Sequence, residues 1–194
     1  MKPGQVAIGA PERQHVVEVD LVERAAHGDQ GAYEQLVTTR ADRIFRIARA
    51  ILGNEPDARD ATQDAFVAAW RDLPRLREPG AFDAWLNRIC VNACHTRLRG
   101  RRRVHEVSLE EAPDRVSDVA ALPDHLSDSD LLARAFRRLD PDHRTILVLR
   151  HLDDQTVDAI ASTLGIPAGT AKSRLFRARN ALERALELEG QARR

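Results

Sequence analysis

The sequence is poor in aromatic residues and in cysteine, and both shortages limit what the protein can be. Phe, Trp and Tyr make up 4% of the 194 residues, while Ala, Leu and Arg are abundant. That composition favours helices over sheets, and we see no convincing strand pattern or repeat. The two cysteines, Cys90 and Cys94, are too few for a disulfide framework, so we expect a reducing cytoplasm.

Long apolar runs are also missing. No stretch of about 18 apolar residues occurs, so we expect no membrane span. Residues 1–15, "MKPGQVAIGAPERQH", lack the apolar core of a secretory signal, and we expect residues 1–17 to form a flexible lead-in. The sequence shows no Gly-rich phosphate loop and no nucleophile–base pair, so we expect neither an enzyme nor a cofactor.

The charged residues are segregated along the chain, although the formal net charge is +0. Residues 88–103 carry six Arg and no acid, and residues 104–130 carry one Arg and eight acids. Residues 168–179 carry four cations and no acid. Two basic blocks separated by an acidic spacer predict two points of contact with a polyanion.

The hydrophobic spacing predicts an all-α fold of two small helical bundles. Four helical segments make up the first bundle, residues 18–103, and four more make up the second, residues 128–189. Residues 104–127 contain two prolines and many acids without periodicity, so we expect a flexible acidic linker there. Residues 190–194 are expected to be a short tail.

The stretch "LGIPAGTAKSRLFRAR", residues 164–179, predicts a helix-turn-helix. Thr156 is a suitable N-cap for the short helix before it, and Gly165 can take the left-handed conformation that ends that helix. Pro167 then stands at the start of the next helix. A helix, a short turn with Gly and a second helix are typical of this motif.

The second helix of the motif is amphipathic in a way that suits DNA. At about 100° per residue, its apolar residues form one stripe and its polar residues form the opposite face, with Lys172 on the flank. Exposed cations alone would also fit ordinary solvation, but the turn, the stripe and the absence of acids favour entry into a major groove. We call the residues expected to contact duplex DNA the duplex face: Thr170, Lys172, Ser173, Arg174 and Arg177.

The segment 82–103 has a second candidate nucleic-acid face. One side combines an aromatic residue, an amide and cations: Trp85, Arg88, Asn92, His95, Thr96 and Arg99. Such a surface suits single-stranded nucleic acid, where bases stack and phosphates are neutralised. On the angles alone, a half-buried Trp beside solvated Arg is an equally good interpretation.

The preceding helix carries carboxylates on one face. Asp57, Asp60 and Asp64 lie together, with Gln63 at the edge, so this face would repel DNA. It is either a plain solvated face, which the residues alone favour, or a docking surface for a basic protein.

Two rival hypotheses remain open on the residues. Cys90, Cys94 and His95 could suggest a metal or redox site, but His95 lies about 100° from Cys94 on a helix, so buried thiols fit better. A stand-alone helix-turn-helix regulator that binds a palindrome as a dimer would explain residues 128–189 only.

Three stretches together resemble a known family: "DARDATQDAFVAAW", "FDAWLNRICVNACHTRLRGRRR" and "LDPDHRTILVLRHLDDQTVDAIASTLGIPAGTAKSRLFRARNAL". They look like regions two and four of a bacterial sigma factor of the extracytoplasmic-function (ECF) type, in the sigma-70 family. The resemblance covers residues 20–103 and 128–187. It implies a subunit that binds the β′ and β subunits of core RNA polymerase and promoter DNA, and that an anti-sigma factor holds inactive.

The resemblance also implies roles for single residues. Docking on the β′ subunit would fall to the docking face: Asp57, Asp60, Gln63 and Asp64. The unpaired strand of the minus-10 element would be held by the single-strand face: Arg75, Arg77, Trp85, Arg88, Asn92 and Arg99. The duplex face would recognise the minus-35 element. His95, Thr96, Ala171 and Phe176 depart from residues common in the family, which bears on promoter preference.

Overall fold

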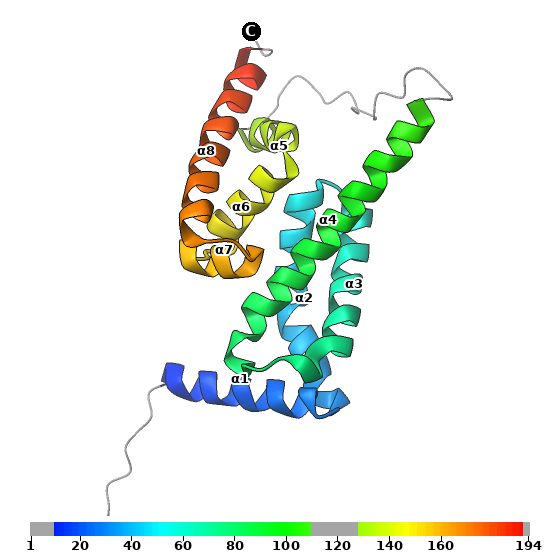
Figure 1. The fold of residues 1–194 in the computed structure, drawn as a ribbon, viewed down its shortest axis with the longest axis vertical. Helices are drawn as coiled ribbons and strands as arrows, with labels where there is room; N and C mark the ends of the chain where they lie inside the picture. The colour runs from blue at the N-terminus through cyan, green and yellow to red at the C-terminus, as the bar shows by residue number, and fades with distance from the viewer. Residues whose placement is uncertain (1–9, 110–127, 192–194) are drawn as a thin grey trace, which may run out of the picture.

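The computed structural model describes residues 10–109 and 128–191, and this part of the chain is helical without a strand (Figure 1). The first bundle consists of α1 (Ala10–Ala26), α2 (Gln30–Leu52), α3 (Glu55–Asp72) and α4 (Phe82–Leu109), with the short 3-10 turns η1 (Leu73–Arg75) and η2 (Pro79–Ala81) between α3 and α4. The second bundle consists of α5 (Asp128–Arg138), α6 (Pro141–His151), α7 (Val157–Leu164) and α8 (Ala168–Gln191).

Two helices of the first bundle extend beyond the boundaries expected from the sequence. α1 begins at Ala10, before residue 18, and Pro11 near its start is well tolerated there. α4 continues past residue 103 to Leu109, because no Pro or Gly follows Gly100 until Pro113. The rest of the expected linker, the residues before Ala10 and the last three residues lie outside the described part of the chain.

Local sequence signals account for several helix ends. The Asp29 side chain accepts a hydrogen bond from the Ala32 amide at the start of α2, and α2 ends at Gly53 with φ 77°. Asn54 caps α3 by accepting from the Asp57 amide at 3.0 Å. These caps satisfy backbone groups that a helix end otherwise leaves unpaired.

Aliphatic side chains fill the inside of the first bundle. α2, α3 and α4 pack along one another, and α1 lies across one end of them (Figure 1). Leu36, Ile44 and Leu86 are fully buried. Tyr33 of α2 contacts two residues of α3. Its hydroxyl donates to the Phe66 carbonyl at 2.5 Å, and its ring lies 4.7 Å from that of Trp70.

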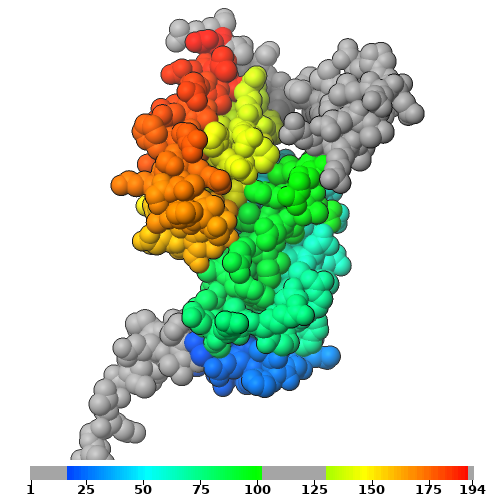
Figure 2. Space-filling view, in the orientation of Figure 1, coloured from blue at the N-terminus to red at the C-terminus, as the bar shows by residue number. Residues whose placement is uncertain are grey.

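The two bundles contact each other, and their buried residues form one continuous cluster. α6 packs on α2 and α7 packs on α4, and Figure 2 shows the second bundle seated against α4. Buried Arg144 of α6 donates to the Ile51 carbonyl of α2 at 2.6 Å, and also to the carbonyls of Arg137 and Leu139. The described residues are therefore one packed unit of two bundles.

Candidate nucleic-acid interface

The helix-turn-helix forms as the sequence predicts. Thr156 caps α7 by accepting from the Ala159 amide at 3.2 Å. Gly165 has φ 64° and ends α7, and its amide donates back to the last turn of that helix. The amide of Ile166 follows by donating to the Ala161 carbonyl at 3.0 Å. These bonds fix the angle at which α8 leaves the turn.

The amphipathic pattern of α8 is confirmed. Ala171, Leu175 and Ala178 are buried against α6 and α7, so the opposite side of α8 points away from the core. The duplex face divides by exposure: Lys172, Ser173 and Arg177 are exposed, while Thr170 and Arg174 are half-buried. The Ser173 hydroxyl donates to the Thr170 carbonyl at 3.0 Å, so it already has a partner within the helix.

The single-strand face is distributed over α4 and the turns before it. Arg88, Asn92 and Arg99 are exposed on α4. Trp85 is half-buried, with its ring 6.0 Å from that of Phe82. The turns carry the remaining two residues, Arg75 and Arg77, both exposed.

The two candidate DNA faces meet across one small cavity, which the sequence did not predict. The cavity has a volume of about 210 Å³, and both Arg88 and Asn92 of α4 line it together with Arg174 of α8. His95 lines it too, and its Nε2 lies 3.0 Å from the Thr145 hydroxyl of α6. Burial lowers the pKa of His95. The structure thus brings one residue of the duplex face beside two of the single-strand face.

Asp153, in the loop after α6, connects the bundles. Its side chain is 5% exposed, lies 3.2 Å from the Arg43 guanidinium and accepts from the Asn87 amide at 2.8 Å. Arg43 and Asn87 belong to the first bundle and also bond each other at 2.7 Å. No local pattern in the sequence distinguishes Asp153 from its neighbour Asp154, because its role depends on contacts with distant residues.

Asp60 and Asp64 of the docking face are exposed on α3 and Asp57 is half-buried, and all three carboxylates have partners from α4. Arg97 bonds Asp60 at 3.0 Å and Asp64 at 2.6 Å, and Arg101 bonds Asp57 at 2.6 Å. Gln63 is exposed at the edge. Both arginines belong to the basic block of residues 88–103, and no local pattern in the sequence connects that block with the acidic helix.

Known proteins share both halves of this architecture. Residues 36–104 match the family model "Sigma-70 region 2", and residues 129–182 match "Sigma-70, region 4". The ECF RNA polymerase sigma factor SigE of Mycolicibacterium smegmatis is 36% identical over 81% of this chain and 63% of that protein. The RNA polymerase sigma-H factor of Pseudomonas aeruginosa is 34% identical over 86% of this chain and 92% of that protein. The chain belongs to the ECF sigma factors of the sigma-70 family.

A solved structure agrees with this assignment. CnrH, solved in complex with the cytosolic domain of CnrY, is 28% identical, with a TM-score of 0.63 over 88% of this chain and 97% of CnrH. As a sigma factor, the protein directs RNA polymerase to promoters and starts transcription, and it is an initiation factor rather than an enzyme. No helix in the described ranges is both long and apolar enough to cross a membrane.

The cysteines of this sigma factor lie in the core of the first bundle. Cys90 and Cys94 are free thiols with no exposed surface, and the Cys90 thiol lies 3.8 Å from the Ile44 carbonyl. The hydrogen bond with Cys94 and burial raise the pKa of Cys90 well above its usual value. His95 contacts Thr145 instead of joining them, and the described residues contain no group of three or more metal-binding side chains.

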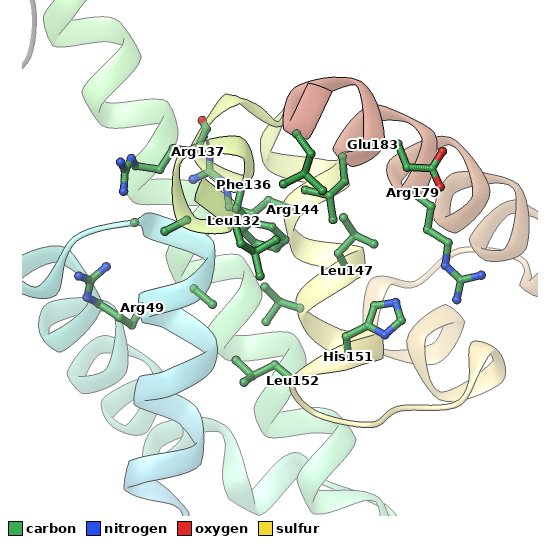
Figure 3. A pocket seen from close by; sticks show the side chains of 16 residues that line it. Arg49, Leu132, Phe136, Arg137, Arg144, Leu147, His151, Leu152, Arg179 and Glu183 are labelled. Carbon is green, nitrogen blue, oxygen red and sulfur yellow. Dashed lines mark hydrogen bonds between the residues drawn. The ribbon is translucent and has the colours of Figure 1, made fainter. Parts of the chain in front are cut away.

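A larger groove of about 690 Å³ lies between the end of α2 and the helices α5, α6 and α8 (Figure 3). Its floor is apolar and includes Leu132, Phe136 and Leu147. Three arginines, Arg49, Arg137 and Arg179, lie along its rim with His151 and Glu183. Sequence reasoning missed this groove, because it forms only where the two bundles meet.

Proposed function

We propose that three faces of this sigma factor divide the work of initiation. The docking face on α3 binds the β′ subunit of core polymerase, and the single-strand face on α4 holds the unpaired strand of the minus-10 element. The duplex face on α8 recognises the minus-35 element. In these terms residues 18–103 act as region two, residues 128–189 as region four and residues 104–127 as the linker.

One observation carries the DNA assignment. α8 follows a left-handed Gly165 turn, buries its apolar stripe against α6 and α7, and leaves Lys172, Ser173 and Arg177 exposed. This geometry lets the N-terminal half of a helix enter a major groove while the rest of the bundle stays packed. Because core polymerase acts on chromosomal DNA, we propose that the protein works in the cytoplasm.

We also propose that a protein partner, an anti-sigma factor, binds this sigma factor and holds it inactive. The large groove supports it, because Leu132 and Leu152 are 47% and 45% exposed there beside several cations, and CnrH was solved with a protein partner. An inhibitor isolated by two-hybrid selection should block run-off transcription. It should fail against a Leu132→Glu factor and still block the Leu188→Glu factor, whose exposed leucine lies outside the groove.

The first test concerns core binding. Asp60→Arg reverses a charge at the centre of the docking face, so it should weaken binding to purified core polymerase at least tenfold while far-UV circular dichroism stays unchanged. Retained core affinity would defeat the docking assignment.

The second test concerns DNA recognition. Arg174→Ala should relax minus-35 discrimination by about 1–3 kcal/mol if the guanidinium contacts a guanine in bidentate fashion. Run-off transcription with core polymerase on promoters selected from a random library measures this preference directly. Tight binding of the isolated protein to an inverted repeat, without polymerase, would instead favour the dimeric regulator.

A further inference from the structure

The ion pairs between α3 and α4 affect how strongly the docking face attracts a basic partner. Asp57, Asp60 and Asp64 would give that face three negative charges. Arg97 and Arg101 pair with all three, so these five residues together carry a net charge of −3 + 2 = −1. A large part of the negative charge available to a basic partner is therefore compensated within the protein itself.

The geometry of Arg97 makes it the central residue of this arrangement. Its two terminal nitrogens reach different carboxylates, Nη1 to Asp60 and Nη2 to Asp64, so one guanidinium bridges two successive turns of α3. The Arg97 side chain is only 27% exposed, whereas Asp60 and Asp64 keep 58% and 59% of their side-chain surface. The carboxylates thus stay reachable, with a fixed cation directly behind them.

The contacted atoms show what remains for a partner. In each of the three ion pairs the recorded contact is with the Oδ2 atom of the aspartate. A partner cation can approach Oδ1 without displacing Arg97, but it then lies close to the Arg97 guanidinium. Like charges at such distances repel each other, and salt screens that repulsion.

We propose that Arg97 is a positioning residue that attenuates the affinity of the docking face for the basic surface of core polymerase. This inference rests on the proposed docking role of α3 and goes beyond it. Arg97 lies on the α3 side of α4, away from Arg88 and Asn92, so it acts on core binding and leaves contacts with the unpaired strand to the other side of the helix. The native factor then binds core polymerase less tightly than its three carboxylates alone would allow.

The test is a gain of binding, which a misfolded variant cannot mimic. The full chain with an N-terminal fluorophore is titrated with purified core polymerase, and fluorescence anisotropy gives the affinity. Arg97→Gln should bind core polymerase about 2- to 4-fold more tightly than the native protein at low salt. This difference should disappear at about 0.5 M salt. Equal or weaker binding by Arg97→Gln at low salt would overturn the proposal.

Two matched variants separate local from general effects. Arg24→Gln makes the same charge change on α1, at an exposed residue that pairs with Asp29 and lies outside the docking face, so it should bind as the native protein does. Arg97→Lys keeps the charge and should also bind as the native protein does. A similar gain in either variant would overturn the proposal, whereas native-like binding by Asp60→Arg would show that the docking assignment itself has failed.

Discussion

At the scale of single residues, the junction between the bundles depends on polar groups that are mostly shielded from water. Arg144 is buried and forms no ion pair with a carboxylate in the part of the chain that the structure describes, and burial lowers its pKa. Its guanidinium donates to three backbone carbonyls, which compensates part of the cost of placing a cation there. His95 also lies at this junction, and burial lowers its pKa, so it favours its neutral form.

His95 should make the stability of the protein sensitive to mild acid. Its pKa is lowered mainly by burial, with Asp142 and Asp140 opposing that shift and Arg99 reinforcing it. Between the lowered folded pKa and the unfolded value of about 6.5, the unfolded chain binds more protons. The stability contributed by neutral His95 is therefore full above about pH 6.5 and is lost as the pH falls below it.

The measurement compares urea unfolding of the native protein and His95→Gln at several pH values. The Gln variant lacks this titration, so the native protein should lose more free energy of unfolding between pH 7.5 and 5.5 than the variant does. Parallel curves for the two proteins would contradict the prediction.

At the scale of elements, the turn between α7 and α8 depends on one backbone angle. Gly165 has φ +64°, and a Cβ added there would meet no atom within 4 Å. Gly165→Ala should therefore cost about 1–2 kcal/mol from backbone strain alone, without a steric clash. Gly169→Ala is a matched control, because Gly169 lies in the helical part of α8 and is equally open. Thermal unfolding should show a loss for the first variant and no loss for the second.

Most of this element structure could be predicted, because local signals determine it. The caps at Thr156, Gly165 and Gly53, and the buried stripe of α8, follow from residue type and spacing. The start of α1 at Ala10 and the end of α4 at Leu109 could not be placed as well. Neither end carries a capping residue that could have placed it from the sequence, and assigned helix ends shift by a residue or two in any case.

At the scale of the whole molecule, the contact between bundles was not predictable from the sequence. It rests on pairs far apart in the chain, such as Asn87 with Asp153 and Arg144 with Ile51. The same contact brings Arg88, Asn92 and Arg174 to one cavity. If these residues bind two separate promoter elements, as we propose, the bundles have to move apart when the promoter is bound.

Asp153→Ala should weaken the junction between the bundles. Removing this carboxylate leaves Arg43 without one of its two carboxylate partners and takes an acceptor from Asn87. We expect a loss of about 2–3 kcal/mol, below the usual cost of breaking a buried pair because Arg43 is partly exposed. Urea unfolding measures the loss, and Asp42→Ala on the exposed side of α2 should change stability by less than about 0.5 kcal/mol.

The placement of the indole rings has a practical consequence for such experiments. Trp70 and Trp85 are the two tryptophans of the chain, and both belong to the first bundle. Intrinsic emission therefore reports on that half, while circular dichroism follows both. If Asp153→Ala uncouples the halves, the two signals of this variant should separate into distinct unfolding transitions. No attached fluorophore is needed to detect that the two bundles unfold independently.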